Sequence, residues 1–194
     1  MSKNVIRNQM LARRNAITFE LLEAASVAAQ KRLIAMEEFC TAACIAIYSA
    51  IHKEIRTDLI FDVALSEGKD ILFPAVCENK IRFTKVTDRK HLNYGSFGIL
   101  EPCPFEIERS IEDADLIVVP GVAFDFNGNR IGFGKGYYDQ CLSRISGRGV
   151  LVGLCHDFQV VESLPTDEHD ISMRYLVTDK RIIIAGTGQT AGLT

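Results

Sequence analysis

The feature that most constrains this 194-residue chain is the stretch 118–139, in which an apolar segment runs into a cluster of glycines. The apolar run from Leu116 to Val119 is typical of a buried strand, and Pro120-Gly121 would end it, because proline cannot donate to a β-ladder. Gly132-Phe-Gly-Lys-Gly136 then places three glycines at alternate positions around one lysine. Tyr137 to Arg144 has the composition of a helix. The combination predicts a phosphate cradle, in which backbone N–H groups and a helix N-terminus face one anion.

Two common nucleotide-binding patterns do not describe this loop. A P-loop requires a glycine five residues before Gly134 and a Ser or Thr after Lys135, but Asn129 and Gly136 occupy those places. The dinucleotide fingerprint requires a third glycine where Tyr137 stands. The sequence therefore predicts a phosphate loop of another kind.

The segment Asn129-Arg-Ile-Gly-Phe-Gly-Lys-Gly-Tyr-Tyr-Asp139, preceded by Pro120-Gly-Val-Ala-Phe-Asp125, resembles the signature of the 5-formyltetrahydrofolate cyclo-ligase (5,10-methenyltetrahydrofolate synthetase) family. The resemblance extends over nearly the whole chain except the C-terminal tail. It implies an ATP- and Mg²⁺-dependent cyclisation of 5-formyltetrahydrofolate to 5,10-methenyltetrahydrofolate, with release of ADP and phosphate, through a phosphorylated formyl (iminium phosphate) intermediate. Phe133 departs from the basic or tyrosine residue of some members, and Gln140 from a common arginine.

The first thirteen residues after Ser2, Lys3 to Asn15, read as a helix. At about 100° per residue, Lys3, Arg7 and Arg14 fall within roughly 40° of one another around its axis. Such a stripe is often a solvated face. The family resemblance instead implies that Lys3 and Arg7 bind the phosphates of ATP, with Arg14 on the same helix face.

Glu54 is the predicted binding residue for the folate. It follows an apolar run at 43–50 that reads as a buried strand, and in open α/β sheets ligands gather beyond the carboxyl ends of strands. Taken alone, Glu54 reads as a surface charge. The resemblance implies a contact with the pterin ring, whose two adjacent N–H donors match a bidentate carboxylate, with Ser49 and Ile51 lining the same pocket.

The resemblance also assigns the phosphoryl-transfer residues. Lys135, Arg130 and the amides of Gly132 to Gly136 would neutralise the transferred group, and Tyr137 and Tyr138 would close over the reacting folate. We take Lys135, Arg130 and Tyr137 as catalytic. The predicted ATP site comprises Lys3, Arg7, Arg130, Gly132, Phe133, Gly134, Lys135, Gly136, Tyr137 and Tyr138. The predicted folate site comprises Ser49, Ile51, Glu54, Phe133, Gly134, Lys135, Gly136 and Tyr137.

Two acidic positions are candidates for Mg²⁺. Asp139 lies one turn into the predicted helix, where a carboxylate can hold the metal that accompanies a triphosphate. The segment Thr166-Asp-Glu-His-Asp170 reads alone as a solvated turn. By resemblance it supplies a second ligand, for which Glu168 is the first choice and Asp170 the second.

The remaining elements predict the fold class. Strands at 69–74, 81–86, 149–155, 175–178 and 181–185 alternate with helices, one of them capped by Thr18 and another at 58–66. This alternation predicts a three-layer α/β sandwich with a mostly parallel central sheet, and the resemblance implies the architecture of sugar-phosphate isomerases and CoA-transferases. We expect one domain over 1–185, a long irregular segment at 87–108 and a disordered tail at 186–194.

Composition limits the partners and the compartment. A net charge of −3 and the absence of a basic arm give no reason to expect nucleic acid. No apolar run approaches the ~18 residues of a membrane span, and the polar N-terminus lacks the pattern of a secretory signal. We expect a cytoplasmic protein with reduced cysteines and small-molecule substrates, as a monomer or, alternatively, a dimer. Two other functions stay open: a sugar-phosphate isomerase relative without ATP, and a non-enzymatic module that buffers 5-formyltetrahydrofolate.

Overall fold

The computed structural model describes residues 1–77, 80–95, 100–102, 108–143, 145, 149–167, 170–187 and 189–191. Its α-helices are α1 (Lys3–Asn15), α2 (Phe19–Ile34), α3 (Glu37–Thr41), α4 (Asp58–Ser66) and α5 (Tyr137–Leu142). Its strands are β1 (Cys44–Ala46), β2 (Asp70–Cys77), β3 (Lys80–Lys85), β4 (Leu92–Tyr94), β5 (Leu100–Pro102), β6 (Glu108–Arg109), β7 (Leu116–Val119), β8 (Ala123–Asp125), β9 (Arg130–Ile131), β10 (Val150–Cys155), β11 (Val160–Val161), β12 (Tyr175–Thr178), β13 (Ile182–Ile184) and β14 (Thr190–Ala191).

The central sheet has a parallel core with antiparallel strands at both ends. Among the described residues its order is β14-β13-β12-β10-β7-β1-β2-β3-β6. The neighbours from β12 to β2 are all parallel, whereas β13, β14, β3 and β6 join antiparallel. Taken in chain order, the five parallel strands have the arrangement 2-1-3-4-5, so the direction of winding reverses between β1 and β7. Ligands of such sheets bind beyond the strand ends at this reversal.

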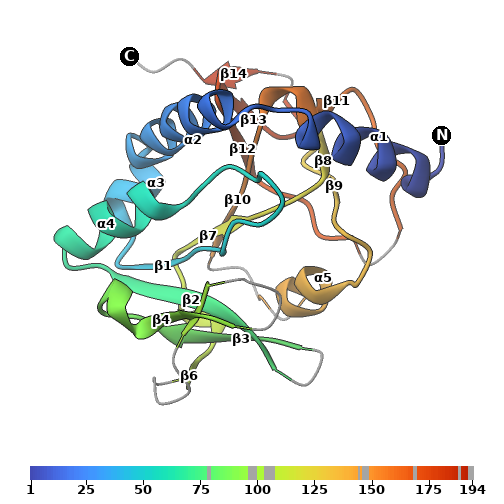
Figure 1. Cartoon of the computed structure of the whole chain (residues 1–194). Helices are drawn as coiled ribbons and strands as arrows, with labels where there is room; N and C mark the ends of the chain where they lie inside the picture. Colours follow the sequence, from blue (N-terminus) through green and yellow to red (C-terminus); the bar gives the residue numbers. More distant parts are fainter. Residues whose placement is uncertain are drawn as a thin grey trace.

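Side chains that alternate along the strands build two apolar layers. In β7, Leu116 and Val118 belong to an apolar cluster with residues of α2, α3 and α4. Ile117 and Val119 belong to another cluster, with Cys141 and Leu142 of α5. Figure 1 shows α2, α3 and α4 on one side of the central strands and α5 on the other. The predicted three-layer α/β sandwich is therefore confirmed. The layer of α2, α3 and α4 contains more helical residues than the layer of α5.

A second, small sheet supports the N-terminal helix. Its strand order is β11-β8-β9. Ile6 and Met10 of α1 are buried in one cluster with Val122, Ala123 and Ile131 of this sheet and its approach. The strand β9 leads directly into the glycine loop, so the same small sheet fixes both α1 and the start of that loop.

Several predicted elements agree closely with the structure and others need correction. The predicted helices at 3–15 and 58–66 match α1 and α4, and Thr18 accepts a hydrogen bond from the N–H of Leu21 at the start of α2. Proline 74 was expected to end a strand, but it lies within β2. The carbonyl of Leu72, two residues earlier, accepts from the N–H of Ile47. Backbone groups two residues apart in a strand point to the same side, so the nitrogen of Pro74 faces the same side as the carbonyl of Leu72. On that side β1 has already ended at Ala46, and the missing N–H of Pro74 therefore costs no hydrogen bond to β1.

The other corrections concern segments with weak local signals. The segment 87–108 contains the 3₁₀ turn Arg89–His91 and an antiparallel pair of β4 with β5, so it is not irregular throughout. Within the expected disordered tail, Thr190 and Ala191 pair with β13. These short strands rely on tertiary partners rather than on their own composition.

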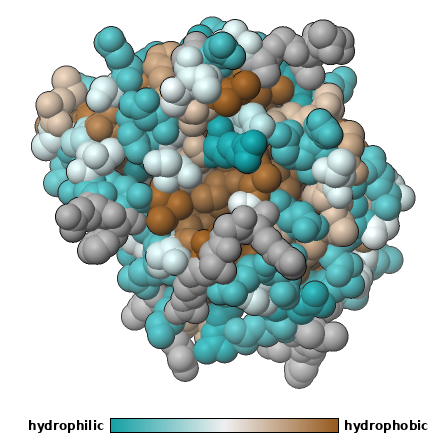
Figure 2. Space-filling model, turned by 180° about the vertical axis from the view of Figure 1, so that it is seen from behind, coloured by the Kyte–Doolittle hydropathy of each residue, from teal (hydrophilic) through white to brown (hydrophobic). Residues whose placement is uncertain are grey.

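Among the described residues no helix combines the length and apolar character needed to cross a bilayer. Figure 2 shows one face on which hydrophobic side chains gather near the middle, with hydrophilic ones around them. The five described cysteines are free, and Cys44, Cys141 and Cys155 among them are buried.

Candidate active site

A cavity of about 600 Å³ lies beyond the carboxyl ends of β1 and β7, at the reversal of the sheet. It brings together the N-terminal helix, the turn that carries Glu54, and the glycine loop. Every predicted site residue lines it except Glu168, which lies outside the described residues. The predicted residues on its wall are Lys3, Arg7, Ser49, Ile51, Glu54, Arg130, Gly132, Phe133, Gly134, Lys135, Gly136, Tyr137, Tyr138, Asp139 and Asp170.

The glycine loop has the backbone that its sequence demands. Gly134 and Gly136 have φ of 97° and 68°, in the left-handed region that glycine adopts at low cost. Gly136 is also the N-cap of α5. Arg7 donates from Nε to the carbonyl of Gly132 at 2.8 Å, which attaches the loop to α1. Because α5 has only six residues, cationic side chains rather than a helix dipole supply most of the positive charge at this loop.

The predicted phosphate-binding cations lie beside the predicted metal-binding carboxylates. Lys3 Nζ is 2.6 Å from Asp170 Oδ2 and 2.8 Å from Asp167 Oδ2, and Arg130 Nη2 is 2.5 Å from Asp139 Oδ1. Burial raises the pKa of Asp170, but the hydrogen bonds from Lys3 and the Asp167 N–H outweigh it and leave the pKa below its usual value. The cavity wall thus has three ion pairs, two made by Lys3 and one by Arg130.

Glu54 is a buried carboxylate on the cavity wall, not a surface charge. Its side chain is 5% exposed, and its Oε2 accepts from the N–H of Ile51 at 3.0 Å. Burial raises its pKa to about 7, although Arg14, the Ile51 N–H and Arg130 act in the opposite direction. A carboxylate so placed changes its charge near neutral pH and can accept from paired N–H donors.

The aromatic side chains of the loop stand next to its cations. The ring centroid of Tyr137 lies 5.7 Å from Lys135 Nζ, and that of Tyr138 lies 5.7 Å from the Arg130 guanidinium carbon. Phe133 is 38% exposed, with its ring 5.7 Å from that of His52. These rings give the cavity flat apolar walls beside its positive groups, which suits a ligand with both a heterocycle and phosphates.

Two of the three carboxylates predicted to bind Mg²⁺, Asp139 and Asp170, are among the described residues, and Glu168 is not. Among the described residues no group of three or more His, Cys, Asp or Glu is arranged to hold a metal ion. Asp139 and Asp170 line the same cavity. Since Mg²⁺ is commonly bound through one or two carboxylates together with substrate phosphates, this donor set fits the ion.

Sequence reasoning missed or misread three residues near the site, of which Asp167 and His52 line the cavity and Arg14 does not. Arg14, placed with the phosphate-binding stripe, is buried and lies 3.6 Å from Glu54. Asp167 belongs to the acidic segment from which Glu168 and Asp170 were chosen, whereas no local pattern marks His52 or pairs Arg14 with a residue 40 positions away.

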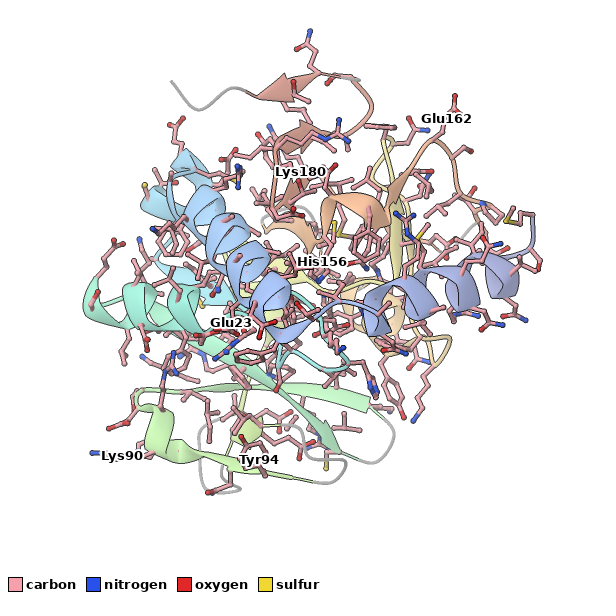
Figure 3. All side chains as sticks on the ribbon, turned by 45° about the horizontal axis from the view of Figure 1, so that its top comes forward. Glu23, Lys90, Tyr94, His156, Glu162 and Lys180 are labelled. Carbon is pink, nitrogen blue, oxygen red and sulfur yellow. The ribbon has the colours of Figure 1, made fainter. Side chains whose placement is uncertain are left out.

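Two other aromatic residues, Phe83 and Tyr94, lie away from this cavity. Phe83 is buried in the apolar cluster of α5. Tyr94 is 78% exposed on β4, where Figure 3 labels it, and lines a second cavity of about 340 Å³.

Comparison with known proteins now decides the family. The sequence pattern of the 5-formyltetrahydrofolate cyclo-ligase family matches residues 1–179. The chain belongs to this family. The resemblance first seen in the glycine loop is thereby confirmed, and with it the enzyme class, a cyclo-ligase.

Individual relatives agree over almost their full length. A probable 5-formyltetrahydrofolate cyclo-ligase of Schizosaccharomyces pombe is 28% identical over 94% of this chain and 98% of its own. The cyclo-ligase of Escherichia coli K12 is 27% identical over 88% of this chain and 96% of its own. The solved structure of 5,10-methenyltetrahydrofolate synthetase from Aquifex aeolicus is 36% identical, with a TM-score of 0.86 over 100% of this chain and 97% of that chain. The fold of this cyclo-ligase is thus shared with that structure from end to end.

Proposed function

We propose that this cyclo-ligase converts 5-formyltetrahydrofolate and ATP to 5,10-methenyltetrahydrofolate, ADP and phosphate in a reaction that requires Mg²⁺. The observation that carries the proposal is the single cavity that joins a buried carboxylate, Glu54, to a cationic glycine loop. A folate needs the first kind of group and a transferred phosphoryl group needs the second. We further propose that the protein acts in the cytoplasm, as a monomer.

The chemistry must turn an amide oxygen into a leaving group. The formyl oxygen attacks the γ-phosphorus of ATP, the bond from that phosphorus to the bridging oxygen breaks, and ADP leaves. The product is an iminium phosphate at N5. The lone pair of N10 then forms a bond to the formyl carbon, N10 loses its proton to solvent, and the carbon–oxygen bond breaks to release phosphate.

The protein contributes mainly position and charge to this sequence. Lys135 and Arg130 lie on the cavity wall, where they would neutralise negative charge on the transferred group. Tyr137 and Tyr138 would cover the folate. Glu54 would accept the two N–H donors of the pterin and so orient the formyl group toward the loop. N10 is itself nucleophilic, so the set needs no general base.

The ion pairs of the cavity wall would be exchanged when nucleotide binds. Lys3 and Arg130 would turn from Asp170 and Asp139 to phosphate oxygens, with Arg7 beside them. Asp139, with Asp170 or Glu168, would hold Mg²⁺, which shields the phosphate charges when bound. These cations, Asp139 and Asp170 line one cavity together, which supports them as the nucleotide site.

An absorbance assay tests the proposal directly. Purified protein is mixed with 5-formyltetrahydrofolate and Mg²⁺, and the near-ultraviolet band of the methenyl product is followed before and after ATP is added. We expect a rise that requires both ATP and Mg²⁺. Folate binding in calorimetry without any rise in absorbance would favour the buffering module. If the protein showed no folate binding and no turnover, the proposal would be refuted.

A further inference from the structure

Arg14 is an arginine in the interior of the protein, close to Glu54. It belongs to the last turn of α1, and its side chain is 1% exposed. Its Nη1 donates to the carbonyl of Gly121 at 3.2 Å and lies 3.6 Å from Glu54 Oε1. The ring of Phe133 lies 5.3 Å from its guanidinium carbon. Arg14 therefore joins α1, the end of β7, the glycine loop and the Glu54 turn at one point.

The hydrogen bonds of this buried pair are incomplete. Within the described part of the chain, Nε and Nη2 of Arg14 and Oε1 of Glu54 have no hydrogen-bond partner. Buried polar groups in proteins are nearly always hydrogen-bonded, and an open position in a buried charged group is costly. A purely structural ion pair would be expected to satisfy these atoms, since a buried pair adds little stability otherwise. Because Glu54 lies on the cavity wall, a ligand in the cavity can complete its open acceptor.

The backbone around Glu54 is held in place at some energetic cost. His52 and Lys53 have φ of 46° and 58°, in the left-handed region that non-glycine residues rarely adopt. Lys53 Nζ donates to the carbonyls of Asn15 and Ile17 at 2.7 and 2.6 Å, and the ring of His156 contacts the Lys53 carbonyl at 3.0 Å. His156 lies in the interior (Figure 3). Backbone strain that several contacts maintain is typical of a functional site, and here α1 supplies both the anchor of the turn and Arg14.

The charged and titratable groups around Glu54 leave Arg14 as its main cationic neighbour. Arg130, Tyr48 and Tyr138 also interact with it electrostatically. However, Arg130 pairs with Asp139, and the hydroxyl of Tyr48 donates to the Ile55 carbonyl at 2.5 Å. Arg14 is the group whose removal would most change the charge state and direction of the Glu54 carboxylate.

From these contacts we propose that Arg14 is a positioning residue for the folate substrate. It acts through Glu54, which it holds at the cavity wall as a negatively charged acceptor for the paired N–H donors of the heterocycle. This inference rests on the proposed function, because it takes the pterin to be the group that completes Glu54. It separates Arg14 from Lys3 and Arg7, which share its helix but face the nucleotide.

The test compares Arg14→Gln with a matched control on the same helix. Arg13→Gln removes the neighbouring arginine, which is exposed and contacts the ring of Phe158. Binding of 5-formyltetrahydrofolate is measured by calorimetry without ATP, and kcat/KM is measured from pH 6 to pH 9. We expect Arg14→Gln to weaken folate binding at neutral pH by roughly tenfold or more, with a larger change in KM for folate than in kcat or in KM for ATP.

The pH profile distinguishes positioning from a merely structural role. Without the nearby positive charge, ionisation of Glu54 requires a higher pH. The acid side of the kcat/KM profile should therefore move to higher pH in Arg14→Gln, so that part of the loss is recovered at pH 9. Arg13→Gln and the conservative Arg14→Lys should keep the profile of the natural protein.

A loss of the same factor at all pH values, or folate binding as tight as in Arg13→Gln, would overturn the inference while the proposed function stands. Absence of folate binding by the natural protein would overturn both. If Arg14→Gln does not fold, the double variant Arg14→Gln/Glu54→Gln and Arg14→Lys take its place. The double variant should bind folate no more weakly than Glu54→Gln alone, since Arg14 acts only through that carboxylate, and a further large loss would contradict the proposal.

Discussion

Glu54 is the residue whose chemistry is most sensitive to its surroundings. Burial raises its pKa to about 7, against the opposing effects of Arg14, the Ile51 N–H and Arg130. If the ionised carboxylate receives the pterin, protonation competes with folate binding. We therefore predict that kcat/KM for folate is constant above about pH 7 and falls as the pH decreases below it. Steady-state kinetics over this range at saturating ATP would check the prediction.

The variant Glu54→Gln provides the control for that profile. A glutamine has one acceptor oxygen and no charge to lose, so folate binding should weaken by roughly tenfold to a hundredfold and the acid decrease should disappear. The profile of kcat/KM for ATP, measured at saturating folate, reports any separate titration of the nucleotide. An acid decrease that persists in Glu54→Gln would assign it to another group.

Lys135 tests the other half of the cavity. Lys135 lies within the glycine loop, and its ammonium is 5.7 Å from the ring centroid of Tyr137. We predict that Lys135→Met abolishes turnover while 5-formyltetrahydrofolate still binds, because the positive charge is needed when the phosphoryl group is transferred and not when the pterin docks. Product absorbance and calorimetry measure the two properties. Turnover at the natural rate would remove Lys135 from this role.

At the scale of elements, the glycine loop and α1 form one unit. Gly134 has φ of 97°, and a Cβ there would lie 3.5 Å from the guanidinium of Arg7, which is ordinary contact. The cost of Gly134→Ala is therefore mainly conformational, about 1–3 kcal/mol. Because the loop must move to relieve that strain, we predict a higher KM for ATP.

Gly68 offers a matched control for this substitution. It has φ of 71°, a Cβ there would meet nothing within 4 Å, and it follows α4 away from the cavity wall. Gly68→Ala should lower the melting temperature about as much as Gly134→Ala but leave KM for ATP unchanged. An equal effect of both variants on ATP would mean that the loop backbone does not matter for nucleotide binding.

Sequence patterns predicted those elements whose signal is local. The apolar run at Leu116–Val119 and the helix at Lys3–Asn15 depend on neighbouring residues, and both agree with the structure. The prediction that a strand ends at Pro74 was wrong because a proline fits within β2 only when the neighbouring strand β1 has already ended. The contact of Arg14 with Glu54 likewise depends on tertiary structure, because it requires α1 to cross the end of the sheet, and so local sequence could not predict it. The family resemblance supplied site residues that spacing alone left ambiguous.

At the scale of the whole molecule, α1 closes the cavity from a position outside the main sheet. It is packed on the small sheet through Ile6 and Met10, and it reaches the cavity through Lys3 and Arg7. The two sides of the proposed ATP site therefore belong to different parts of the fold, α1 on one side and the loop after β9 on the other. A nucleotide that contacts both would join them.

We therefore predict that Mg·ATP stabilises the protein through α1. A ligand at a hundred times its Kd adds about 2.7 kcal/mol to the free energy of unfolding, which for a domain of this size raises the melting temperature by roughly 5–10 °C. Thermal melts with Mg²⁺ and ATP, together with hydrogen exchange over residues 3–15, measure the global and the local effect. The double variant Lys3→Gln/Arg7→Gln should lose most of the shift and of the protection in α1, whereas Arg13→Gln should retain both. A full shift in the double variant would show that the loop holds ATP without the helix, and the ion pairs of Lys3 would then serve only to attach α1 to Asp167 and Asp170.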